Sequence, residues 1–165
     1  MPFLFSVLYV AILGIASHFI GEALPRRFQP DRFPFRSWKW EREGKIYDKI
    51  RIRAWKDHMP DMSRIMKDMV PKRVGPCPKA EQVRVLIQET CVAEVVHVSL
   101  CLLAPVIYCF WWNGVGVLLS VLVVVGNLPF ILIQRYNRPA LIVLEARLKA
   151  REERKKRHAS VDSVG

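Results

Sequence analysis

The sequence lacks charged residues over two long stretches. Residues 95–134 contain no Lys, Arg, Asp or Glu, and residues 3–24 contain only Glu22. A helix of roughly 20 apolar residues is enough to cross about 30 Å of hydrocarbon. The longer stretch is about twice that length and is interrupted by the polar turn Trp111-Trp112-Asn113-Gly114. We therefore predict three membrane-spanning helices, at about 3–23, 93–112 and 115–134.

The sequence also lacks the glycine-rich and cysteine-rich signatures of several protein classes. It has no Gly-x-Ser-x-Gly, no P-loop and no dinucleotide-binding glycine fingerprint. Hydride transfer with a domain-bound nucleotide and phosphoryl transfer by a P-loop are therefore poor candidates. Its four cysteines have no Cys-x-x-Cys spacing, and three of them lie in or beside a predicted span. Such cysteines behave as small apolar residues, so we expect no disulfide framework.

Positive charge is abundant, but only outside the predicted spans. Residues 25–90 hold 17 Lys and Arg against 9 Asp and Glu, and residues 135–165 hold 9 against 4. By the positive-inside rule, both blocks lie in the cytoplasm, and the N-terminus and the Trp111–Gly114 turn lie outside. No nucleic-acid fold signature occurs among the basic residues, so we assign them to orientation and lipid contact and expect no nucleic-acid partner. The first run lacks a basic leader, which favours a retained helix over a signal peptide.

These patterns predict an all-α multi-pass protein of the cell membrane. About three transmembrane helices carry a cytoplasmic, partly interfacial loop domain and a C-terminal amphipathic helix. Within the loop domain, residues 45–55 fit either a helix or a short strand, and residues 61–69 form a short amphipathic helix. Pro139 predicts a turn before the last helix. The expected organisation is a first span at 1–24, a basic and aromatic region at 25–90, a transmembrane hairpin at 91–134, a basic helix at 135–157 and a disordered tail at 158–165.

Two polar segments stand at the ends of the hairpin, and both are expected at the same membrane face. The first carries the three residues that we predict to be catalytic, Glu89, Glu94 and His97. Because Glu94 and His97 are three residues apart, they share a helix face, where a carboxylate orients an imidazole as a general base. A histidine near a span is also often a structural hydrogen-bond donor. A metal site made of the same three residues is a further alternative, although we predict no bound metal.

The second polar segment predicts substrate binding. Guanidinium groups suit a phosphate or an oxyanion, and amides add nothing to membrane orientation. Simple anchoring of the helix end by arginine is the plain alternative. The residues expected to bind substrate are Asn127, Gln134, Arg135, Asn137 and Arg138, with Arg53 and Trp55 as weaker additions.

The chain resembles the glycosyl-4,4'-diaponeurosporenoate acyltransferase (CrtO) family of small bacterial membrane proteins. The resemblance rests on Glu41-x2-Gly44-Lys45, Arg53-x-Trp55-Lys56 and Glu89-Thr90-x3-Glu94-x2-His97. Its most specific part is Asn127-x-Pro129-x4-Gln134-Arg135-Tyr136-Asn137-Arg138-Pro139. It covers most of the chain in order, except about 57–80 and the tail after about 155.

The resemblance implies a membrane acyltransferase that esterifies a sugar hydroxyl of a glycolipid, a glycosyl carotenoid in staphyloxanthin-type biosynthesis. The expected partners are the lipid bilayer, the glycolipid acceptor and an acyl donor, either acyl-CoA or acyl carrier protein. No cofactor is expected. The alternatives are a metal-dependent lipid-modifying enzyme that uses Glu89, Glu94 and His97, and a non-catalytic membrane scaffold. No sequence feature predicts an oligomeric state.

Overall fold

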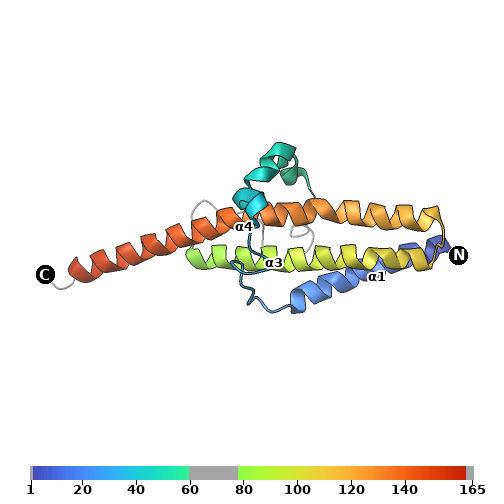
Figure 1. Ribbon diagram of the computed structural model, residues 1–165. Coiled ribbons are helices and arrows are strands. Elements are labelled where there is room, and N and C mark those ends of the chain that lie inside the picture. The colour runs from blue at the N-terminus through green and yellow to red at the C-terminus, as the bar shows by residue number, and fades with distance from the viewer. Residues whose placement is uncertain (1, 60–77, 163–165) are drawn as a thin grey trace.

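A computed structural model describes residues 2–59 and 78–162, and within these ranges all regular structure is helical. Three long helices dominate, and shorter helices follow the first and the second of them (Figure 1). In chain order the elements are α1 (Pro2–Ala23), η1 (Lys39–Ile50), α2 (Ile52–Trp55), η2 (Lys56–His58), α3 (Ala80–Leu103), η4 (Ala104–Cys109) and α4 (Gly114–Asp162). The predicted helix at 61–69 falls outside the described residues.

Three helical segments in the described part of the chain are long and apolar enough to cross a membrane. They are Phe3–Ala23, Ala80–Cys109 and Gly114–Ser160, with mean hydropathies of 2.2, 2.0 and 2.5. Most apolar side chains of α1 are exposed, as is usual for a helix surrounded by lipid. The all-α class is therefore confirmed, and each predicted span overlaps a helix that is long and apolar enough to cross a membrane.

The second and third long helices form an antiparallel hairpin whose two arms are in close contact. Ser120 of α4 donates to the carbonyl of Ala104, and the Cys101 thiol lies 3.9 Å from the carbonyl of Val124. At the turn, Trp111 Nε1 donates to Ser6 Oγ of α1 at 3.0 Å. The start of α1 and the hairpin turn therefore lie at the same end of the molecule (Figure 1). Which side of the membrane this end faces stays a prediction.

The last helix is continuous, which corrects two predictions. The chain does not turn at Pro139, because α4 runs unbroken from Gly114 to Asp162 with Pro129 and Pro139 inside it. Proline is tolerated within membrane helices when neighbouring groups hold the backbone in place. Here the side chain of Arg138 is held by four hydrogen bonds immediately before the second proline. The expected disordered tail is also wrong as far as Asp162, since these residues are helical.

The segment after α1 crosses the hairpin and reaches its opposite side (Figure 1). The side-chain amide of Gln88 holds the crossing, since it donates to the carbonyl of Phe28 and accepts from its N–H. The short helices η1, α2 and η2 then pack on α4, where Tyr47, Ile52 and Ile133 form a buried core. The hydrophobic pattern of residues 45–55 fits either a helix or a strand, and in this packing the segment forms short helices.

Candidate functional site

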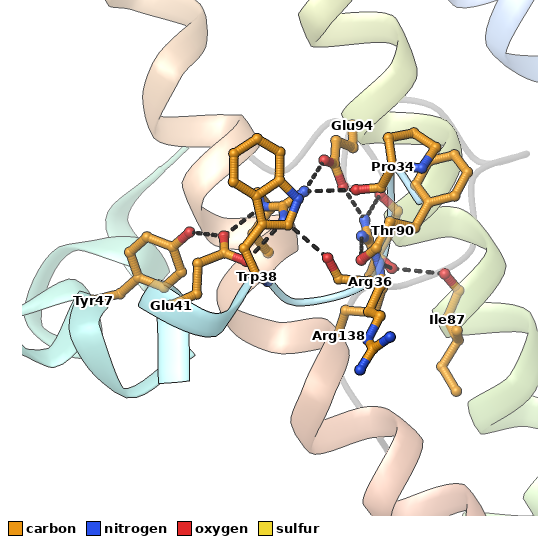
Figure 2. A network of polar contacts seen from close by, with 11 residues as sticks. Pro34, Arg36, Trp38, Glu41, Tyr47, Ile87, Thr90, Glu94 and Arg138 are labelled. Carbon is orange, nitrogen blue, oxygen red and sulfur yellow. Dashed lines mark hydrogen bonds and ion pairs between the residues drawn. The ribbon is translucent and has the colours of Figure 1, made fainter. Parts of the chain in front are cut away.

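The two polar ends of the hairpin meet in a buried ion network. Glu94 of α3 accepts from Arg135 Nη1 through one carboxylate oxygen, at 2.6 Å, and from Arg138 Nη2 through the other, at 2.5 Å. Arg138 also donates to the hydroxyl and carbonyl oxygens of Thr90 and to the carbonyl of Phe35 (Figure 2). Only 2% of Arg138 and 6% of Glu94 is exposed. The two ends of the hairpin therefore converge as expected, and ion pairs join them.

The second arginine of the network has every donor occupied. A guanidinium group has five N–H donors. In Arg135 these five reach both oxygens of Glu41, one oxygen of Glu94 and the carbonyls of Pro34 and Arg36. The arginine thereby ties the crossing segment to both arms of the hairpin. A phosphate would have to displace one of these contacts, so the geometry favours a positioning role.

Glu41 is the network member that sequence reasoning missed as a site residue. It is 1% exposed and accepts from Arg135, from the hydroxyl of Tyr47 and from the backbone N–H of Trp38. Burial by itself raises the pKa of Glu41, but these hydrogen bonds and the Arg135 charge outweigh burial and lower it below its usual range. Burial and the neighbouring carboxylate raise the pKa of Tyr47, so its hydroxyl keeps its proton. The signal in the sequence is the motif Glu41-x2-Gly44, which forms part of the family resemblance.

The lowered pKa of Glu41 predicts a specific acid sensitivity. A carboxylate whose folded pKa lies below its unfolded value stabilises the fold fully above the unfolded value, ordinarily about 4.3. That stabilisation is lost as the pH falls through the lower, folded pKa. We therefore expect the melting temperature of the purified protein, measured by thermal unfolding, to fall as the pH is lowered below about 5. Glu41→Gln should be less stable at neutral pH and show a shallower fall, and a fall equally steep in the variant would contradict this role.

His97 is paired with an amide across the hairpin. Its Nδ1 lies 2.8 Å from Asn127 Oδ1, and its ring stacks on Phe130 with the centroids 4.7 Å apart. The Asn127 amide nitrogen donates to the carbonyl of Val123, so its oxygen faces the imidazole and accepts the Nδ1 proton. In the neutral form of the imidazole, this contact would place the lone pair on Nε2. The contact that orients His97 across the hairpin thus comes from Asn127, while Glu94 binds two arginines.

Glu89 lies in a different environment from Glu94 and His97. Its carboxylate accepts from Arg26 Nε at 3.0 Å, near the end of α1. In the described part of the chain, no group of three His, Cys, Asp or Glu side chains lies close enough to hold a metal ion. The alternative metal site of Glu89, Glu94 and His97 is therefore not assembled here.

The remaining predicted substrate residues lie apart from the ion network. Arg53 Nε donates to the Tyr136 hydroxyl at 2.6 Å, and Lys56 donates to Asn137 at 3.1 Å. Both contacts join the short helices to α4. The indole of Trp55 donates to a backbone carbonyl and packs on the small core beneath. Gln134 is buried. The structure brings Arg53, Trp55 and Asn137 together as contacts between elements, and their part in binding substrate stays a prediction.

A basic groove opens beside the ion network. It has a volume of about 1350 Å³ and is bounded by the crossing segment, the start of η1 and the part of α4 that begins at Arg135. A second, apolar cavity of about 100 Å³ lies among α1, α3 and α4 and reaches Asn127. The described residues therefore define a membrane protein with an imidazole–amide pair in its hairpin, a cationic groove on one side and an apolar cavity on the other.

Comparison with known proteins places this chain among acyltransferases. The family model described as CrtO, glycosyl-4,4'-diaponeurosporenoate acyltransferase, matches residues 31–147. A protein of that name from Staphylococcus aureus (strain bovine RF122 / ET3-1) is 28% identical over 152 residues, which is 91% of this chain and 92% of the relative. One from Staphylococcus haemolyticus (strain JCSC1435) is 34% identical over 108 residues, or 65% and 63% of the two chains. No solved structure matches.

The chain belongs to the CrtO family of acyltransferases. The matched region begins in the crossing segment and ends within α4, so it includes every residue of the ion network together with His97 and Asn127. The resemblance inferred from the motifs is confirmed.

Proposed function

We propose that this protein transfers a fatty acyl group from a thioester to a sugar hydroxyl of a glycosylated lipid. A glycosyl carotenoid, such as the glycosyl-4,4'-diaponeurosporenoate in the names of its relatives, is the proposed acceptor. The observation that carries the proposal is the His97–Asn127 pair, because it places a basic nitrogen within the membrane hairpin of an acyltransferase-family chain.

In the proposed reaction, His97 acts as the general base. Its Nε2 takes the proton of the sugar hydroxyl while the hydroxyl oxygen forms a bond to the thioester carbonyl carbon. The tetrahedral intermediate collapses with cleavage of the carbon–sulfur bond, and the leaving thiolate receives the proton from the imidazolium. Asn127 holds the productive tautomer by accepting from Nδ1, and the stacked ring of Phe130 restrains the plane of the imidazole.

The ion network positions this base. Glu94 lies three residues before His97 on α3, which corresponds to a rise of about 4.5 Å along the helix. Because Glu94 is held by Arg135 and Arg138, the register of α3 against α4 is set next to the imidazole. We assign Glu94 and the two arginines as positioning residues, and Glu41 joins them by holding Arg135.

The membrane setting explains how a lipid acceptor reaches the base. The apolar cavity lined by Tyr9, Leu13, Gly14 and Leu100 ends at Asn127 and gives part of a hydrocarbon chain a place between α1 and the hairpin. We further propose that the ion network faces the cytoplasm, as the distribution of Lys and Arg favours. A cytoplasmic thioester donor would then meet the sugar at the inner surface of the membrane.

Lipid analysis of living cells tests the proposed activity. The gene is expressed in a host that makes a glycosyl carotenoid but lacks the final acyl transfer, and lipid extracts are examined by mass spectrometry. We expect a new species whose mass equals that of the acceptor plus one fatty acid less one water. Accumulation of unmodified glycosyl carotenoid at unchanged levels, despite normal membrane insertion of the protein, would argue against this acceptor.

A further inference from the structure

The basic groove has no role in the proton-transfer chemistry described above, and its described lining carries more positive than negative side chains. Arg135 and Arg138 form its inner wall, and their charges are offset by Glu41 and Glu94. Further basic side chains around the groove are all exposed, and the described residues supply none of them with an ion pair: Arg32, Arg36, Lys39, Arg42 and Lys45.

Among the described side chains that line the groove, Asp31 supplies one further carboxylate. The described side chains therefore place five exposed cations and the carboxylate of Asp31 around one concavity. Cations around a concave surface strengthen the positive electrostatic potential there. Such a surface favours a ligand with several negative charges. The groove thus fits a ligand with more than one phosphate better than it fits a single carboxylate.

Aromatic surface lies among these cations. Phe33 is 83% exposed and Trp38 is 49% exposed, and both line the groove. The Trp38 ring is held from one side by Arg135, whose guanidinium carbon lies 5.5 Å from the ring centroid, and by the edge of Trp40 at 6.1 Å. An exposed, oriented indole next to cations is a stacking surface for a planar base that carries phosphates.

One polar atom in the groove wall lacks a hydrogen bond. The hydroxyl oxygen of Ser37 is buried without a partner among the described residues, in a segment where the neighbouring backbone carbonyls are engaged by Arg135. Buried polar groups nearly always have partners, so this hydroxyl is available to hydrogen-bond a water or a ligand in the groove.

From these features we infer that the groove binds the nucleotide diphosphate part of an acyl-CoA-type thioester donor. The inference rests on the proposed acyl transfer. The phosphates lie among the five cations, the planar base lies against Phe33 and Trp38, and the flexible thioester arm extends past Arg135 toward the hairpin. Arg135 and Arg138 of the inner wall bind Glu94, which lies about one helical turn from His97, so the arm is directed toward the base.

The shape of the groove distinguishes this donor from two other anions. An acyl carrier protein presents a convex acidic surface, which a concave groove with aromatic walls does not match. The headgroup of an anionic lipid supplies phosphate but no planar ring for the indole. The exposed basic residues near the end of α4 stand outside the groove and therefore provide a matched control for charge alone.

Equilibrium binding tests the inference without requiring turnover. The full-length protein is placed in phosphatidylcholine nanodiscs, and its affinity for CoA is measured by calorimetry. We expect the variant Arg36→Gln/Lys39→Gln/Lys45→Gln to bind CoA about tenfold more weakly or worse, which corresponds to about 1.4 kcal/mol. The control variant Arg151→Gln/Arg154→Gln/Lys155→Gln loses the same charge and should stay within twofold of the unmodified protein.

The other outcomes are equally specific. Equal losses in both variants would show an unspecific charge effect and overturn the inference. Binding of inorganic phosphate or of acyl carrier protein with no binding of CoA would overturn it too, as would groove-dependent binding only when anionic lipid replaces phosphatidylcholine. If CoA binds as expected but no acyl transfer occurs, the proposed function fails while the groove assignment stands. If acyl transfer occurs with an unaltered donor KM in the groove variant, only the groove assignment fails.

Discussion

Replacing His97 by Ala should lower kcat for acyl transfer by about 10²–10⁴-fold, the usual contribution of a positioned general base. The expected loss follows from the geometry at Asn127, which accepts the Nδ1 proton and leaves the lone pair on Nε2. The ion pairs of Glu41 and Glu94 with Arg135 and Arg138 remain in this variant, so we expect the hairpin to stay folded. Turnover is measured with purified protein in nanodiscs at saturating donor and acceptor.

The chain supplies its own control for this substitution. His18 lies on α1, where its ring is 5.5 Å from that of Phe19, and it takes no part in the hairpin contacts described above. His18→Ala should keep kcat within about twofold, and both variants should melt within a few degrees of the unmodified protein. An undiminished kcat in His97→Ala would remove the general base from the mechanism.

The second large effect is expected on stability, at Glu94. Glu94→Gln keeps the shape of the side chain but leaves the positive charge of Arg138, which is 2% exposed, without its carboxylate partner. Loss of one partner of a buried ion pair costs about 3–5 kcal/mol. We expect a correspondingly lower unfolding midpoint in detergent denaturation, and loss of acyl transfer because the register of α3 beside His97 is disturbed.

Glu89 is a control for this experiment, because it has the same charge as Glu94 but is less buried. Glu89 lies five residues earlier on α3 and pairs with Arg26, but both side chains are about a quarter to a third exposed. Glu89→Gln should therefore cost at most about 1 kcal/mol. The double variant Glu94→Gln/Arg138→Gln should recover part of the lost stability, since it removes the stranded charge. Equal effects of the two single glutamate substitutions would contradict the network as drawn in Figure 2.

The sequence was sufficient to predict the convergence of Glu94 with Arg135 and Arg138. Two apolar runs joined by a short turn must fold back as antiparallel helices, and this places their polar ends together. The partner of His97 was not predictable from spacing along one helix. Glu94 is its neighbour in the sequence, but the contact across the hairpin depends on helix rotation, which only packing decides.

The position of Glu41 was beyond sequence reasoning for a different reason. Its contact with Arg135 spans 94 positions, and it depends on the path that the crossing segment takes over the hairpin. Neither periodicity nor composition specifies such a path. The turn expected at Pro139 failed because local backbone preference was outweighed by side-chain contacts of Arg138 with α3. Local rules therefore worked for the spans and failed where buried polar contacts hold the chain.

The catalysis proposed for this chain is tested most directly by following one labelled acyl group. Purified protein in phosphatidylcholine nanodiscs is given an isotopically labelled acyl thioester and a glycosyl carotenoid, and the products are separated and identified by mass spectrometry. We expect the label in an ester on the sugar, with release of one free thiol for each ester formed. Thiol release without a sugar ester, or no consumption of any thioester by correctly folded protein, would contradict acyl transfer to a sugar hydroxyl.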